Sequence, residues 1–128
     1  MKYLTAEQVL FLHATMITET GGSHGVRDIE MLQSSVSRPK ATFDGHKLSF
    51  EVHLKAAAMM HSLIQNHPFL DGNKRTAITA AALFLRLNKF EFNATNQEVE
   101  IFTLTVARGE KEPDEISKWL IENSELIT

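Results

Sequence analysis

Apolar residues at helical spacing, interrupted by strong capping and breaking signals, are the feature that most restricts the fold of this chain. Thr5 and Gln8 form a capping box, and so do Thr95 and Glu98. Apolar residues follow both boxes at the i, i+3, i+4 spacing of an amphipathic helix. Because helical segments separated by short loops account for most of the 128 residues, the sequence predicts an all-α fold, a compact bundle of about six helices in a single domain over residues 1–128.

Glycine, proline and capping residues set the expected limits of these helices. The predicted helices cover residues 5–20, 28–37, 49–66, 73–87, 95–109 and the stretch that begins at Pro113. Asp28 is expected to cap the second helix. This helix should end before Arg38-Pro39, because proline disfavours a helical conformation in the residue before it. The stretch from Pro39 to Leu48 is predicted to be a loop or a small hairpin.

The third and fourth helices are expected to form the core. The inward-facing residues predicted for the third helix are Val52, Ala56, Ala57, Met60, Leu63 and Ile64. The alanine-rich middle of the fourth helix, around residues 77–82, predicts close packing on several sides.

Composition excludes several classes of protein. The chain has no cysteine, which rules out disulfide scaffolds, thiolate metal sites and cysteine nucleophiles. A net charge of -3 provides no overall positive potential for binding nucleic acid. The apolar run from Ala77 to Leu85 is too short to cross a membrane, and Lys2 is not followed by an apolar signal segment. The expected compartment is therefore the cytoplasm.

Residues 67–76, which join the third and fourth expected helices, concentrate reactive side chains in the order His-Pro-Phe-Leu-Asp-Gly-Asn-Lys-Arg-Thr. Lys74 and Arg75 lie in a first helical turn, where cations oppose the helix dipole by roughly 0.3–1 kcal/mol each. A phosphate-bearing ligand would supply the missing negative charge. Asp71 offers a hard oxygen ligand of the kind preferred by Mg²⁺ on a nucleotide. His67 is a candidate general base near neutral pH.

Each of these residues also has an ordinary structural interpretation. Asp71 or Asn73 could simply cap the fourth helix, and a histidine before a proline is common in loops. The spacing of His53, His61 and His67 does not place three ligands on one helical face, so no dedicated zinc or iron site is expected.

The whole segment resembles the motif HPFx(D/E)GNGRxxR of the Fic/Doc superfamily. Two positions differ, because Lys74 replaces the second glycine of GNG and Ile78 replaces the final arginine. Both differences resemble the death-on-curing (Doc) branch, whose motif is HxFxDxNKR. Further Doc-like segments occur at residues 21–22, 25–28, 38–39 and 84–88.

The resemblance implies a role for each residue of the motif. His67 would take a proton from a hydroxyl of a target protein, and Asp71 would hold Mg²⁺ on the phosphates of ATP. Gly72 would let backbone amides approach these phosphates. Asn73, Lys74 and Arg75 would bind and stabilise them, while Phe69 would anchor the segment in the core.

The implied activity is that of a Doc-like toxin of a type II toxin–antitoxin system in the bacterial cytoplasm. It would transfer the γ-phosphate of ATP to a serine or threonine of a translation factor, and the resemblance suggests elongation factor Tu. The bulky, charged Lys74 distinguishes this kinase reaction from the nucleotidylyl (AMP) transfer of other Fic proteins. AMP transfer, or a catalytically silent Fic-fold binding module, are the alternatives.

The resemblance also bears on substrate alignment and inhibition. In relatives, a flap between the early helices and the motif aligns the target backbone, and Thr42 and Phe43 have the strand-like character that such a flap needs. An inhibitory helix of the Ser/Thr-x-x-x-Glu-Gly/Asn type is not convincing here, because Thr15 and Glu19 are followed by Thr20. The implied inhibitor is a separately encoded small antitoxin that folds on binding.

Overall fold

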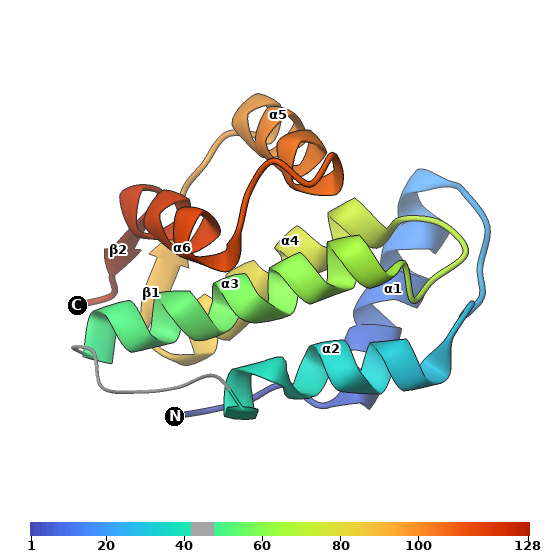
Figure 1. Ribbon diagram of the computed structural model, residues 1–128, viewed down its shortest axis with the longest axis horizontal. Coiled ribbons are helices and arrows are strands. Elements are labelled where there is room, and N and C mark those ends of the chain that lie inside the picture. Colours follow the sequence, from blue (N-terminus) through green and yellow to red (C-terminus); the bar gives the residue numbers. More distant parts are fainter. Residues whose placement is uncertain (42–47) are drawn as a thin grey trace.

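The computed structural model describes residues 1–41 and 48–128. In this part of the chain, six helices are joined by short connections, and two three-residue strands follow the fourth and sixth helices (Figure 1). The elements are α1 (Ala6–Thr20), α2 (Ile29–Ala41), α3 (Leu48–Asn66), α4 (Asn73–Leu87), β1 (Phe90–Phe92), α5 (Asn96–Ala107), α6 (Pro113–Glu122) and β2 (Ser124–Leu126). The predicted helical fold is confirmed.

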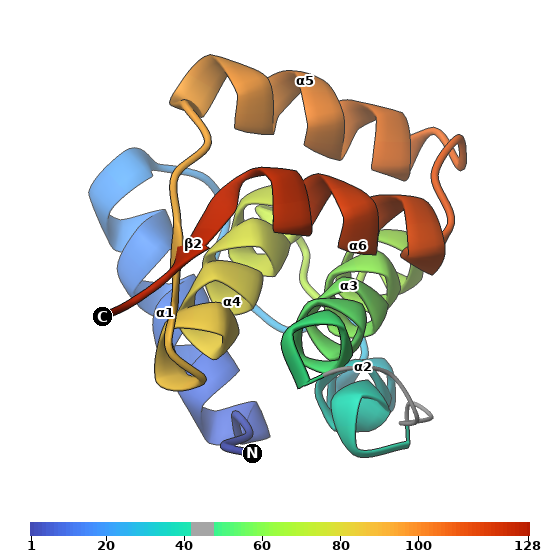
Figure 2. The same cartoon turned by 90° about the vertical axis from the view of Figure 1, so that its left-hand side faces the viewer.

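Helix α3 is the centre of the bundle, with α2, α4 and α6 packed around it (Figure 2). All six residues predicted to face inward from this helix are buried. Ala58 is buried as well, and together with Ala56 and Ala57 its small side chain lets neighbouring helices approach the α3 backbone closely. Most of the α3 surface is therefore covered, which makes it the element on which the rest of the fold is assembled.

Capping explains where several helices begin. Both predicted capping boxes are present, at Thr5 of α1 and at Thr95 of α5. Pro113 occupies the first turn of α6, as expected for a residue without an N–H. The Oδ1 atom of Asp28 accepts a hydrogen bond from the Met31 N–H at 3.1 Å, which confirms Asp28 as the cap of α2.

The predicted end of α2 before Arg38-Pro39 is wrong, because the helix continues to Ala41 with Pro39 inside it. Pro39 has no N–H to donate to the carbonyl four residues earlier, so the last turn lacks one intrahelical hydrogen bond. It is buried against the rest of the bundle, and its carbonyl oxygen accepts a hydrogen bond from Lys55 Nζ of α3 at 2.7 Å. Packing between α2 and α3 thus outweighs the tendency of proline to end a helix at the residue before it.

The short sheet was not predicted. β1 and β2 pair antiparallel, with Phe90 opposite Leu126 and Phe92 opposite Ser124. A strand of three residues is too short to show the alternation of apolar and polar residues by which strands are predicted. The two strands pair because the packing of the helices brings them together. The flap prediction falls mainly on residues 42–47 and so lies outside the described residues. None of the described helices is long and apolar enough to cross a bilayer.

Candidate functional site

The turn between α3 and α4 places His67 at the surface in an uncommon conformation. His67 is exposed and has a φ of 47°, in the left-handed region that residues with a Cβ rarely adopt. Its carbonyl oxygen accepts a hydrogen bond from Arg27 Nε, and the carbonyl of Asn66 accepts one from Arg27 Nη2, both at 2.6 Å. The chain therefore changes direction at His67, where Arg27 binds the carbonyl groups of both Asn66 and His67.

The segment that joins α1 and α2 runs beside this turn at the same end of the molecule (Figure 1). Val26 and Phe69 form an isolated antiparallel bridge, and the Leu70 N–H donates to the Gly25 carbonyl at 3.1 Å. The Arg27 N–H donates to the Pro68 carbonyl at 2.7 Å. The motif is thus held by backbone pairing with residues about forty positions earlier in the chain.

Phe69 anchors the turn from below, as expected. Its ring is buried in the main core cluster and stacks on the buried imidazole of His13, from α1. His13 Nε2 also donates to the Asp71 carbonyl at 2.8 Å. One histidine of α1 therefore supports both the aromatic anchor and the backbone of Asp71.

The amide side chain of Asn73 closes the turn internally. Its Oδ1 accepts from the Phe69 N–H at 2.9 Å, and its Nδ2 donates to the Phe69 carbonyl at 3.0 Å. The Asp71 Oδ1 accepts from the Gly72 N–H at 2.8 Å, and Oδ2 accepts from the Ser23 N–H at 3.1 Å. Neither side chain caps α4, so the plain capping interpretation of Asp71 and Asn73 is wrong.

Helix α4 instead begins at Gly72, which adopts a left-handed conformation and leaves the first turn without a side-chain cap. Lys74 and Arg75 lie in this turn and are exposed, and the turn contains no acidic residue. Among residues 1–41 and 48–128, neither cationic side chain has a hydrogen bond or an ion pair. Uncapped N–H groups, the positive end of the helix dipole and two cations make this turn, the candidate anion site, chemically suited to an anion.

Two glycines allow the close approach of the segments around Asp71. A Cβ on Gly22 would lie 2.6 Å from Asp71 Oδ2, and one on Gly72 would lie 2.7 Å from Met16 Cε. The sequence singles out Gly72 at this site, but it indicates Gly22 and Arg27 only as parts of family-like segments and does not indicate His13. Nothing in the local sequence shows which distant carbonyls the Arg27 side chain binds.

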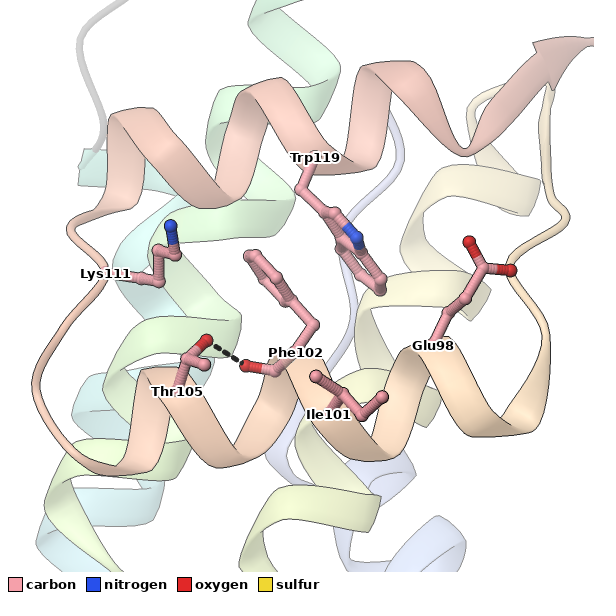
Figure 3. Close-up of a pocket in the computed structure, with 6 residues that line it drawn as sticks. All are labelled: Glu98, Ile101, Phe102, Thr105, Lys111 and Trp119. Atoms are coloured by element: carbon pink, nitrogen blue, oxygen red, sulfur yellow. Dashed lines mark hydrogen bonds between the residues drawn. The ribbon is translucent and has the colours of Figure 1, made fainter.

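An apolar hollow and the side chains of His53 and His61 belong to other parts of the bundle. A shallow apolar hollow of about 260 Å³ between α5 and α6 has the stacked rings of Phe102 and Trp119 in its lining, and no residue of the motif contributes to it (Figure 3). His53 Nε2 lies 2.7 Å from Ser124 Oγ, where it joins α3 to β2. Burial lowers the pKa of half-buried His61, an effect partly opposed by Glu112 and reinforced by Arg38.

Residues 3–85 match the family model of the Fic/DOC family. The chain belongs to the Fic/Doc family. The matched region runs from the start of α1 almost to the end of α4, so it includes the candidate anion site and the segments that brace it.

Two relatives place the chain in the Doc branch of the family. The chain is 41% identical to the Toxin Doc of Mycolicibacterium smegmatis over 93 residues, which cover 73% of this chain and 69% of the relative. It is 30% identical to the Protein kinase doc of Escherichia phage P1 over 112 residues, which cover 86% of each chain. The resemblance inferred from the motif is therefore confirmed at the level of the branch.

Proposed function

We propose that this chain is a Doc-like toxin that transfers the γ-phosphoryl group of ATP to a serine or threonine hydroxyl of a protein in the bacterial cytoplasm. The observation that carries the proposal is the uncapped first turn of α4, where Lys74 and Arg75 are exposed directly after the turn that carries His67 and Asp71. Phosphoryl transfer depends mainly on positioning and charge stabilisation, and this arrangement offers both.

The phosphates of ATP would lie against the first turn of α4. The N–H groups of this turn and the side chains of Lys74 and Arg75 would bind them, with Gly72 leaving the backbone open to the ligand. Asn73 would contribute differently from Lys74 and Arg75, because its amide is engaged with Phe69. We assign two roles to Asn73: its side chain holds the phosphate-binding turn in shape, and its backbone N–H donates to the phosphates.

Asp71 has the properties required to hold Mg²⁺. It is exposed, and each carboxylate oxygen accepts one backbone N–H, which leaves further lone pairs for a hard cation. When bound, Mg²⁺ would neutralise charge on the ATP phosphates. The Gly22–Ser23 backbone would keep the carboxylate directed toward the phosphate-binding turn.

His67 would act as the general base. The hydroxyl oxygen of the target forms a bond to the γ-phosphorus while the bond from that phosphorus to the departing ADP breaks, and the hydroxyl proton passes to the His67 imidazole. The His67 side chain is exposed, so a hydroxyl carried on a second protein can reach it.

Lys74 supports transfer of the γ-phosphoryl group over transfer of AMP. A nucleotidylyl transferase needs space at this position for the β- and γ-phosphates, and a lysine side chain fills such space. The Protein kinase doc of Escherichia phage P1 carries the corresponding activity in its name. By the same family resemblance, we assign the target to the translation factors, with elongation factor Tu as the first to be tested, and the inhibitor to a small antitoxin acting in trans.

Labelled ATP tests the reaction. Purified elongation factor Tu, and separately a bacterial extract, are incubated with the chain and either γ-labelled or α-labelled ATP. We expect label on protein from γ-labelled ATP only, and none with His67→Ala. Transfer of α-label would show AMP transfer, and equal labelling by the variant would exclude His67 as the base. Absence of labelling in both, with growth arrest retained by His67→Ala in cells, would indicate a silent binding module.

A further inference from the structure

The backbone at His67 needs an external constraint. With φ at 47°, this residue lies in a conformation that is less favourable for a side chain with a Cβ than the extended or helical regions. It also follows the last residue of α3, where carbonyl groups have no partner within the helix. Something other than the local sequence must therefore hold the turn.

The guanidinium group of Arg27 supplies this constraint. Its Nε donates to the His67 carbonyl and its Nη2 to the Asn66 carbonyl, each at 2.6 Å. Both acceptors lie at the negative end of the α3 dipole, which favours a cation. The two donors belong to one rigid, planar fork, so the two carbonyls are held at a fixed spacing and angle.

Holding these two carbonyls fixes the direction of the Cα–Cβ bond of His67, from which the imidazole extends. The Asn66 carbonyl lies in the peptide plane before the His67 Cα, and the His67 carbonyl lies in the plane after it. When both planes are fixed, so are both backbone torsions of His67. The next carbonyl, that of Pro68, accepts from the Arg27 and Asp28 N–H groups at 2.7 and 3.1 Å, which fixes the chain beyond the turn.

We infer that Arg27 is a positioning residue for His67: its side chain, bound to the Asn66 and His67 carbonyls, sets the direction in which the imidazole meets the target hydroxyl. This inference rests on the proposed phosphoryl transfer. The Nε and Nη2 donors of Arg27 are directed to carbonyl oxygens of α3 and the turn, so the role assigned to them is to hold the backbone at His67.

The matched pair of variants is Arg27→Lys and Arg86→Lys. Lysine keeps the charge at position 27 and the backbone hydrogen bond to Pro68, but it cannot hold two carbonyls with one planar fork. Arg86 is also exposed and is bonded to Glu91 at 2.6 Å, remote from the motif in α4. The same chemical change at Arg86 therefore controls for the loss of a guanidinium group elsewhere on the surface.

Steady-state kinetics separate positioning from folding. We expect Arg27→Lys to lower kcat on the order of 100-fold, the effect typical of a misplaced catalytic group, while KM for ATP stays within about twofold. Arg86→Lys should retain both constants. The inference is overturned if kcat is unchanged, if KM for ATP rises in parallel, or if kcat falls only in proportion to a folded fraction measured by circular dichroism.

Nuclear magnetic resonance of His67 tests the same contact without any catalysis. In protein with labelled histidine, Arg27→Lys and Arg27→Gln should shift and broaden the His67 ring resonances, whereas those of the distant His53 should stay in place. Unchanged His67 resonances in both variants would overturn the inference. If the variants shift the His67 resonances but the wild-type protein transfers no phosphoryl group, the Arg27–His67 contact is retained and the proposed function is rejected instead.

Discussion

The imidazole of His13 stacks on the ring of Phe69, with centroids 3.8 Å apart and planes inclined by 5°, and its Nε2 lies 2.8 Å from the Asp71 carbonyl oxygen. A carbonyl oxygen only accepts, so Nε2 carries the proton in this contact. A single buried side chain of α1 therefore joins the aromatic anchor of the motif to the residue assigned to Mg²⁺.

Substitution of His13 should separate these two contacts. His13→Phe keeps the stacked ring but leaves the Asp71 carbonyl without its donor, so the free energy of unfolding should fall by about 1–3 kcal/mol. His13→Ala also removes the ring and should cost more, on the order of 3–5 kcal/mol. Urea unfolding measures both values. A His13→Phe variant as stable as the wild type would show that the hydrogen bond contributes nothing.

Alanine at Gly22 or Gly21 should test the placement of the Asp71 carboxylate. Both glycines have positive φ, at 114° and 87°, so alanine strains the backbone at each by about 1–3 kcal/mol. Only at Gly22 would the new Cβ meet Asp71 Oδ2, whereas nothing lies within 4 Å at Gly21. Calorimetry should find weaker Mg²⁺-ATP binding for Gly22→Ala than for Gly21→Ala. Equal weakening of Mg²⁺-ATP binding in the two variants would show that the Asp71 carboxylate is not part of the nucleotide site.

The features that the sequence alone predicted are the local ones. Capping boxes at Thr5 and Thr95, and the break at Pro68, lie within a few residues of the effects they cause. The predicted end of α2 before Arg38-Pro39 is wrong because Lys55, sixteen positions away, binds the Pro39 carbonyl. The contact of Arg27 with His67 spans forty positions. Such pairs are set by the packing of helices, which periodicity does not reveal.

Thr76 offers a route to a more stable protein. Its Oγ1 is buried and, within residues 1–41 and 48–128, has no hydrogen-bond partner. Because an unsatisfied buried hydroxyl is costly, Thr76→Val should raise the free energy of unfolding by roughly 1 kcal/mol.

Thr103 provides the matched control. It is also a buried helical threonine, but its Oγ1 donates to the Val99 carbonyl at 2.8 Å. Thr103→Val should therefore lower the free energy of unfolding by about 0.5–1.5 kcal/mol. Thermal or urea unfolding of both variants measures these opposite changes. A Thr76→Val variant less stable than the wild type would show that the Thr76 hydroxyl has a hydrogen-bond partner in solution.

His61 should make stability depend on pH. Burial, the largest cause, and the nearby Arg38 lower its pKa, while Glu112 raises it. Since the folded pKa lies below the unfolded value of about 6.5, the unfolded chain binds more protons between the two values. Stability attributable to His61 should therefore rise with pH through this window and level off above it. Urea midpoints of His61→Gln should show a smaller rise than the wild type, and an identical rise would contradict the assignment.

The covering of α3 by α6 has a consequence for the timing of synthesis. Ile116 and Leu120 of α6 are fully buried, and β2 pairs with β1 only after α6 has been made. Translation proceeds from the N-terminus at about 5–20 residues per second, so a growing chain carries the apolar surface of α3 uncovered for several seconds. The contacts that hold the turn at His67 come from Arg27 and the segment before α2, which have already been synthesised by then.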